Sequence, residues 1–145
     1  MRIFIDTNIL LYRVNQDFPE HMKTKKCLDS LIEKHTLFCL SYGVIYEFLR
    51  VSTHPRVFSK PLSSKNAFSF ISQFFETVSI SFLSPTDRHF EVLKQTLSEL
   101  HLPMGNLFHD IHSAILMREN DVREIMTADH DFLQFKFLKV INPLV

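Results

Sequence analysis

The chain opens on the stretch MRIFIDTNILLY, residues 1–12, where one apolar run ends at an acid and a second run follows it. The apolar run Ile3-Phe4-Ile5 predicts a strand over residues 2–6, and residues 8–14 predict the start of a helix. Asp6 therefore lies at the carboxyl end of a strand. An acid in that position caps the next helix or ligates a metal ion, and the choice depends on which other acids reach the same point.

Beyond this stretch, short β-like runs alternate with amphipathic helical runs. Strands are predicted at residues 2–6, 37–40, 78–82, 124–127 and 137–141, and helices at 8–14, 19–34, 41–53, 63–75, 88–101 and 108–120. Ser41 and Ser63 are placed to cap helices, Pro55 ends one helix, and residues 103–106 predict a turn. The alternation predicts an α/β fold with a parallel sheet of four to five strands, helices on both faces, and ligands beyond the strands' carboxyl ends.

The composition predicts one soluble globular domain spanning residues 1–145, with 46% hydrophobic and 22% charged residues and only 2 glycines. So few glycines argue against a β-sandwich or barrel with many tight turns. No run approaches the ~20 apolar residues of a membrane span, and the start does not resemble a signal peptide, so a cytoplasmic protein is expected. In a reducing cytoplasm, Cys27 and Cys39 are expected to be free thiols.

Four carboxylates come from separate segments that the topology brings to one edge of the sheet. They are Asp6, Glu47 in SYGVIYEFLR (41–50), Asp110 in NLFHDIHSAI (106–115) and Asp129 in IMTADHDF (125–132). Carboxylates packed this closely repel one another unless protons or cations neutralise them. A site made only of oxygen ligands selects a hard cation, so Mg²⁺ or Mn²⁺ is expected.

Each acid also has an ordinary structural explanation. Asp6 can be a simple N-cap, and Glu47 a solvated helix residue. Asp110 can complement the helix macrodipole, while Asp129 and Asp131 can form a turn. Only the joint placement at one sheet edge favours a metal site.

Four motifs in this order resemble a PIN-domain ribonuclease: IDTNILLY, YGVIYEFLR, HD at a helix start, and TADHDF. The segment THPRVFSKPLS after the glutamate helix narrows the resemblance to the VapC toxins of bacterial toxin–antitoxin pairs, over residues 2–132. The resemblance implies a three-layer α/β/α fold and divalent-metal-dependent cleavage of structured RNA: transfer RNA first, otherwise ribosomal or messenger RNA. It also implies a homodimer and inhibition by a small cognate VapB-type antitoxin.

The resemblance assigns metal binding and catalysis to Asp6, Glu47, Asp110 and Asp129. Asn8 and Thr127 match supporting polar positions, and Asp131 is an additional acid whose expected role is to shape the turn. Hydrolysis is expected to leave a 5′-phosphate and a 3′-hydroxyl.

RNA binding requires positive charge near the acids. Arg50, Arg56, Lys60 and Lys65 follow Glu47 and could line a backbone-binding rim, although a solvated loop with scattered charge explains them equally well. Tyr42 or Tyr46 could stack on an unpaired base, but core packing is the favoured interpretation of both. Phe108 and the Phe-rich segment AFSFISQFF (67–75) are also expected to face the core. An apolar patch near Leu28, Leu31 and Phe38 could receive a second copy or an antitoxin helix.

Several rival functions remain open from the residues alone. His109 and His112 suggest a zinc cluster or histidine acid–base catalysis that yields a cyclic phosphate, but a third ligand at a recognisable spacing is missing. A phosphoacceptor signalling domain would need an acid pair at the first strand, where Asp6 stands alone. A catalytically silent interaction module and a non-toxin PIN nuclease of RNA processing are the remaining alternatives.

Overall fold

A computed structural model describes residues 1–101, 103 and 105–145 of the chain. Five strands form one sheet in the order β3-β2-β1-β4-β5, and all four neighbouring pairs are parallel. The strands are β1 (Arg2–Ile5), β2 (Leu37–Leu40), β3 (Ser79–Phe82), β4 (Glu124–Met126) and β5 (Lys139–Ile141). The α/β class and the parallel sheet predicted from the sequence are confirmed, with five strands as the count.

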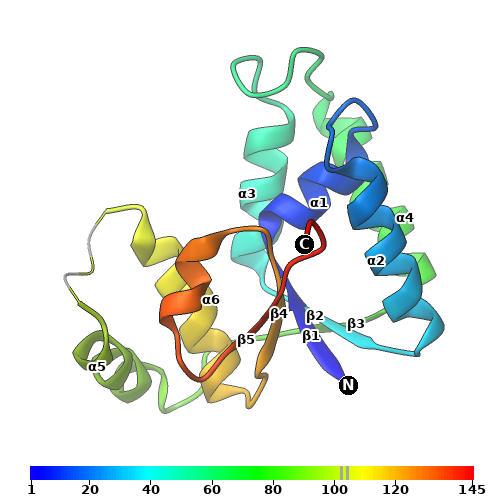
Figure 1. Cartoon of the computed structure of the whole chain (residues 1–145). Coiled ribbons are helices and arrows are strands. Elements are labelled where there is room, and N and C mark those ends of the chain that lie inside the picture. Colours follow the sequence, from blue (N-terminus) through cyan, green and yellow to red (C-terminus); the bar gives the residue numbers. More distant parts are fainter. Residues whose placement is uncertain (102, 104) are drawn as a thin grey trace.

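Helices cover both faces of this sheet. They are α1 (Thr7–Val14), α2 (His21–Glu33), α3 (Tyr42–Ser52), α4 (Ser64–Thr77), α5 (His89–Glu99) and α6 (Leu107–Glu119), followed by the short 3₁₀ helix η1 (His130–Gln134). In Figure 1, helices α1 to α4 gather on one side of the strands, while α5 and α6 lie on the other. The three-layer arrangement follows from parallel connections, each of which must cross over the sheet through a helix.

The core lies along the central strands. In β1 and β2 the last three residues of each strand are fully buried, and β4 adds Ile125 and Met126. Such strands are apolar on both faces because helices cover both. This explains why Ile3, Phe4 and Ile5 form an unbroken apolar run. The edge strand β3 is only partly buried.

Side-chain caps fix where two helices begin. Ser41 Oγ accepts a hydrogen bond from Val44 N at 3.2 Å, and Ser63 Oγ accepts one from Asn66 N at 3.1 Å. Both predicted caps are therefore confirmed. Two residues beyond the ends of α2 and α6, His35 (φ 58°) and Asp121 (φ 59°) have left-handed backbone, a conformation that glycine usually takes after a helix. The turn predicted at residues 103–106 includes Met104, which lies outside the described residues.

The register of the sheet sets the position of the acids. Ile5 pairs with Met126, and Asp6 N donates to Met126 O at 3.1 Å. Asp6 therefore lies beside Thr127, although 121 residues separate them in sequence. The carboxyl ends of β1 and β4 meet at one edge, as expected for a parallel sheet.

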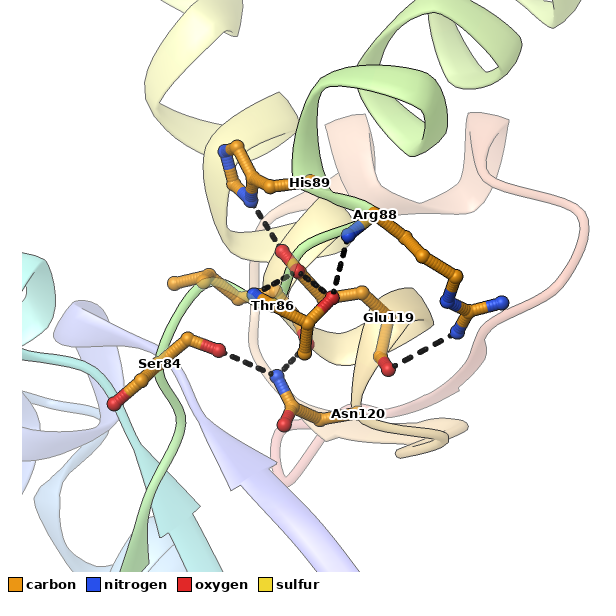
Figure 2. A network of polar contacts seen from close by, with 7 residues as sticks. Ser84, Thr86, Arg88, His89, Glu119 and Asn120 are labelled. Atoms are coloured by element: carbon orange, nitrogen blue, oxygen red, sulfur yellow. Dashed lines mark hydrogen bonds and ion pairs between the residues drawn. The ribbon is translucent and has the colours of Figure 1, made fainter.

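A buried glutamate holds the far end of α6, the helix that carries Asp110 in its first turn. Glu119 Oε1 accepts hydrogen bonds from Thr86 N (2.5 Å) and Thr86 Oγ1 (2.7 Å), and its other oxygen pairs with His89 Nδ1 (Figure 2). Asn120 Nδ2 donates to Ser84 O at 3.0 Å. These contacts attach the β3–α5 connection to the end of α6.

Several packing expectations are wrong. Phe108 is 47% exposed, so it does not face the core, and Phe68 in the Phe-rich segment is also exposed. Leu28, Leu31 and Phe38 are buried in the hydrophobic core, so they form no surface patch. Cys27 and Cys39 are free thiols, as expected. Of the helices described, none has both the length and the apolar character needed to cross a membrane.

Candidate active site

Asp6 is held rigidly at the end of β1. Its Oδ1 accepts a hydrogen bond from Thr7 N at 2.8 Å, at the start of α1. Its Oδ2 accepts from Thr127 Oγ1 at 2.7 Å and from Asn8 Nδ2 at 3.0 Å. Asp6 therefore caps helix α1, which was one of its two predicted roles. It also lies at the edge of the sheet where a ligand would bind.

Asn8 and Thr127 connect the two strand ends. Asn8 Nδ2 also donates to Thr127 Oγ1 at 3.1 Å, and Asn8 Oδ1 accepts from Ala128 N at 3.2 Å. Thr127 Oγ1 accepts from Asp129 N at 3.0 Å. One hydroxyl therefore fixes both the carboxylate of Asp6 and the backbone that leads into Asp129.

Glu47 reaches the same edge from α3. Its Oε2 accepts a hydrogen bond from Thr7 Oγ1 at 3.1 Å, which ties the glutamate to the residue that follows Asp6. Thr7 is not among the site residues predicted from the sequence. Its position between an acid at a strand end and the first turn of a helix is the signal that could have pointed to it.

Three further acids converge beside Asp6. One carboxylate oxygen from each of Asp110, Asp129 and Asp131 lies within 4.8 Å of the other two. A cavity of about 310 Å³, here called the acid pocket, is lined by Glu47, Arg50, Asn106, His109, Asp110, Asp129 and Asp131. Asp129 Oδ1 also accepts a hydrogen bond from Asp131 N at 2.9 Å. The turn predicted at Asp129 and Asp131 is therefore present, and its two acids also belong to the acid cluster.

Crowding perturbs the titration of these acids. Burial is the main reason that the pKa of Asp110 rises to about 7, and the negative charges of four neighbours add to it: Asp6, Asp129, Asp131 and Glu47. Burial also raises the pKa of Asp6 to about 6, despite the opposing hydrogen bonds from Thr127 and Thr7. The cluster therefore takes up protons at neutral pH when no cation neutralises it.

The donor set fits a hard divalent cation. All the converging atoms are carboxylate oxygens, the ligand type preferred by Mg²⁺ and Mn²⁺. Burial and, to a smaller extent, mutual repulsion raise the pKa values of Asp6 and Asp110, and a bound cation would favour their ionised forms. Asp110, Asp129 and Asp131 supply the closest set of oxygens, with Asp6 and Glu47 adjoining them.

The two histidines beside Asp110 have separate environments. His109 lines the acid pocket, whereas the His112 ring packs edge-on against His89 with centroids 5.8 Å apart. Burial lowers the pKa of His112. Within residues 1–101, 103 and 105–145, the acid cluster is the metal-competent group that the geometry identifies.

The predicted RNA-binding residues are divided by position. Arg50 lines the acid pocket, while Arg56 and Lys60 are exposed in the loop after α3 and are not among the described residues that line it. Tyr42 and Tyr46 are 62% and 71% exposed, so the expected core packing of both is wrong. They lie on the first turns of α3, whose buried face is formed by Val44, Phe48 and Ser52 instead.

Comparison with known proteins gives one consistent result. Residues 3–138 match the PIN domain family. Ribonuclease VapC33 of Mycobacterium tuberculosis is 30% identical over 142 residues, which cover 98% of each chain. Ribonuclease VapC43 of the same organism is 29% identical over 97% of this chain and 94% of its own.

Solved structures share the fold. VapBC2 of Rickettsia felis, crystallised with a DNA fragment from its promoter, aligns over 98% of each chain with a TM-score of 0.71 and 20% identity. VapC20 of Mycobacterium tuberculosis, a toxin that cleaves the sarcin–ricin loop, aligns over 94% of this chain and 96% of its own, with a TM-score of 0.65 and 18% identity. At these identities the likeness establishes the architecture.

Proposed function

This chain belongs to the PIN-domain family, and from that premise we propose that it is a metal-dependent endoribonuclease serving as the toxin of a VapC-type toxin–antitoxin pair. The observation that carries the proposal is the convergence of Asp110, Asp129 and Asp131 in a pocket that Glu47 also lines. Relatives named as ribonucleases, matched over nearly their whole length, support the reaction class.

The proposed cation is Mg²⁺ or Mn²⁺, held by Asp110, Asp129 and Asp131 together with Asp6. Such an ion, when bound, supplies an acidified water at neutral pH and neutralises charge that develops on a phosphate. The chain's own contribution is rigidity. Thr127 and Asn8 hold Asp6 in one orientation, as partners of ligating carboxylates commonly do.

Two residues act on the substrate side of this proposal. Glu47, whose Oε2 is held by Thr7 Oγ1, orients the attacking water. Arg50, which lines the same pocket, contacts a phosphate of the RNA backbone and offsets the repulsion between RNA and the acids. Arg56 and Lys60 extend this positive charge along the loop that follows α3.

We propose structured RNA as the substrate, with transfer RNA first and ribosomal or messenger RNA as alternatives. This substrate places the activity in the cytoplasm. Solved neighbours that are complexes named VapBC support a VapB-type antitoxin as the partner, and we propose that the toxin is a homodimer.

The test is an RNA digest with the purified chain, comparing Mg²⁺, Mn²⁺ and chelator. We expect cleavage of a transfer RNA pool with the metals only, leaving 5′-phosphate and 3′-hydroxyl ends. Asp110→Asn should lower the rate by more than about 100-fold, because it removes a proposed ligand. Asp17→Asn, which changes an exposed acid outside the pocket, is the matched control.

Other outcomes would identify the rivals. Cyclic phosphate ends that persist in chelator would indicate histidine catalysis and contradict the proposal. Metal-dependent cleavage without growth arrest on expression in bacteria would favour a processing nuclease over a toxin. Absence of cleavage from every RNA offered, with the fold intact, would favour a silent interaction module.

A further inference from the structure

A second cavity adjoins the acid pocket on α3. It has a volume of about 350 Å³ and is lined by Gly43, Tyr46, Glu47, Arg50 and His109; we call it the α3 hollow. Glu47, Arg50 and His109 line both cavities. Whatever binds at the acids therefore extends directly into the hollow.

Tyr46 provides an aromatic surface that the fold does not use. Its side chain is 71% exposed, and it makes no ring contact among the described aromatic residues. Tyr42, one turn earlier, differs because its ring stacks on Phe82 with centroids 4.6 Å apart and an interplanar angle of 12°. An exposed, unpartnered tyrosine at the wall of a cavity is suited to stack on an unpaired base.

Gly43 keeps the hollow open. It is one of only 2 glycines in the chain, and it stands inside a helix, where glycine is less favourable than alanine. Its backbone does not require glycine, since its φ is not positive, and an added Cβ would meet only Ser41 Oγ at an ordinary 3.6 Å. Gly105, in contrast, has a φ of 61°. Neither the backbone nor a steric clash of Cβ therefore requires glycine at residue 43, whereas a longer side chain there would enter the hollow that Gly43 lines.

These positions form one face of α3. Residues three and four apart on a helix are neighbours, so Gly43 lies beside Tyr46 and Glu47, and Arg50 follows one turn later. This face presents open space, an aromatic ring, a carboxylate directed to the acid pocket and a guanidinium. A nucleotide has the matching parts, because its base can stack on the ring and its phosphate can accept from the guanidinium.

We propose that the α3 hollow binds the base of an unpaired nucleotide next to the scissile phosphate, stacked on Tyr46, with Arg50 on its phosphate. The inference rests on the proposed function for the position of that phosphate. Three of the five residues that line the hollow also line the acid pocket, so a ligand of the hollow is continuous with the phosphate bound at the acids, as the base of that nucleotide would be. Recognition of a splayed base restricts the substrate class to loops, bulges and single strands.

The test measures binding separately from cleavage. Fluorescence anisotropy would follow a labelled single-stranded 12-nucleotide RNA of mixed sequence, and its duplex, in chelator. Repulsion from the acids is then the same for each Tyr46 or Gly43 variant. Tyr46→Ala should weaken binding of the single strand about 5- to 100-fold, whereas Tyr46→Phe should keep it within about twofold. Gly43→Leu should weaken binding while leaving the melting temperature near that of the wild type.

Tyr42→Ala is the matched control and should leave the affinity unchanged. Intrinsic fluorescence gives a second readout, because the chain has no tryptophan and only 3 tyrosines. RNA should quench the emission, and Tyr46→Phe should remove that change.

Three results would overturn the subsite. They are no binding of the single strand by the wild type, an RNA affinity that Tyr46→Ala leaves unchanged, and a Tyr46→Ala protein whose oligomeric mass changes while its RNA affinity does not. The third result would indicate that this face of α3 is a protein interface. Failure of cleavage in Mg²⁺ alongside Tyr46-dependent binding would instead contradict the proposed nuclease and leave the subsite supported.

Discussion

At the residue scale, Asp6 combines the two roles that the sequence offered as alternatives. One carboxylate oxygen receives Thr7 N and so caps α1, while the other receives Thr127 and Asn8. Capping fixes the side chain, and a fixed carboxylate is a better ligand than a mobile one. The same interactions therefore stabilise a helix and prepare a metal site.

The raised pKa of Asp110, about 7, makes the stability of the metal-free protein depend on pH. A carboxyl whose folded pKa lies above its unfolded value binds protons more tightly in the folded chain. Its contribution to stability is complete below the unfolded pKa of about 4 and is lost as pH rises through 7. In chelator, Asp110→Asn should therefore exceed the wild type in unfolding free energy by about 0.5–2 kcal/mol at pH 8.

Urea titrations of the two proteins at several pH values check this difference. The advantage of Asp110→Asn should shrink between pH 8 and pH 5, as the wild-type carboxyl becomes protonated. Burial lowers the pKa of His112, which makes stability fall as pH falls in both proteins. Subtracting the unfolding free energy of the wild type from that of Asp110→Asn removes this shared effect. A difference independent of pH would show that Asp110 is not crowded by its neighbours.

Thr127 offers a second residue-scale prediction. Its hydroxyl donates to Asp6 Oδ2 and accepts from Asp129 N, so Thr127→Val should loosen two proposed ligand positions at once. We expect a 10- to 100-fold loss of Mn²⁺ affinity, measured by calorimetry. Thr127→Ser keeps the hydroxyl and should retain most of the affinity. Equal losses in both variants would assign the effect to packing.

The sequence located the acids but not all of their partners. Asp6, Asp110 and Asp129 were predictable because strand ends and helix starts in a parallel sheet share one edge. The position of Asp131 in the acid cluster was not predictable from the sequence. It depends on the 3₁₀ helix η1, which brings the Asp131 carboxylate beside that of Asp129. The exposure of Tyr46 was also missed, because helical spacing alone does not show which face of α3 is buried.

At the scale of elements, α6 carries acids of opposite character at its two ends, and only the second is held by hydrogen bonds. Asp110 lies in the first turn with a raised pKa, whereas Glu119 lies in the last turn. Burial favours the neutral form of Glu119, yet hydrogen bonds from Thr86 and His89 outweigh it and hold its pKa below the ordinary value. A carboxylate in a last turn opposes the helix dipole, and the hydrogen bonds to Glu119 offset that unfavourable interaction.

Replacing Glu119 should loosen the attachment of the β3–α5 connection to α6. Glu119→Ala removes a buried carboxylate, so that Thr86 N, Thr86 Oγ1 and His89 Nδ1 lose their shared partner. We expect a loss of about 2–4 kcal/mol in unfolding free energy, measured in urea. Glu99→Ala breaks the more exposed pair with Arg118 and should cost less than about 1 kcal/mol. Similar losses in the two variants would contradict a structural role for the buried network.

At the scale of the whole molecule, the order and class of the elements followed from sequence because the core strands are apolar throughout and the helices are amphipathic. The points at which helices end were harder to predict from the sequence. His35 and Asp121, two residues beyond the ends of α2 and α6, take left-handed conformations without glycine, so the usual signal of a helix end is absent. The Glu119 network joins segments about 30 residues apart, and only the packed helices bring them together.

The last prediction concerns how the whole fold responds to its proposed ion. Any ligand that binds the folded chain alone stabilises it, by about 2.7 kcal/mol at a hundred times its dissociation constant. For a domain of this size that corresponds to a rise of about 5–10 °C in melting temperature. Mn²⁺ should produce this rise at pH 8 and a smaller one at pH 5, where protons compete for Asp6 and Asp110. Asp110→Asn should start from a higher melting temperature in chelator and gain less from the metal. A melting temperature that Mn²⁺ leaves unchanged at both pH values would mean that the acid pocket does not select a cation, whatever RNA the chain binds.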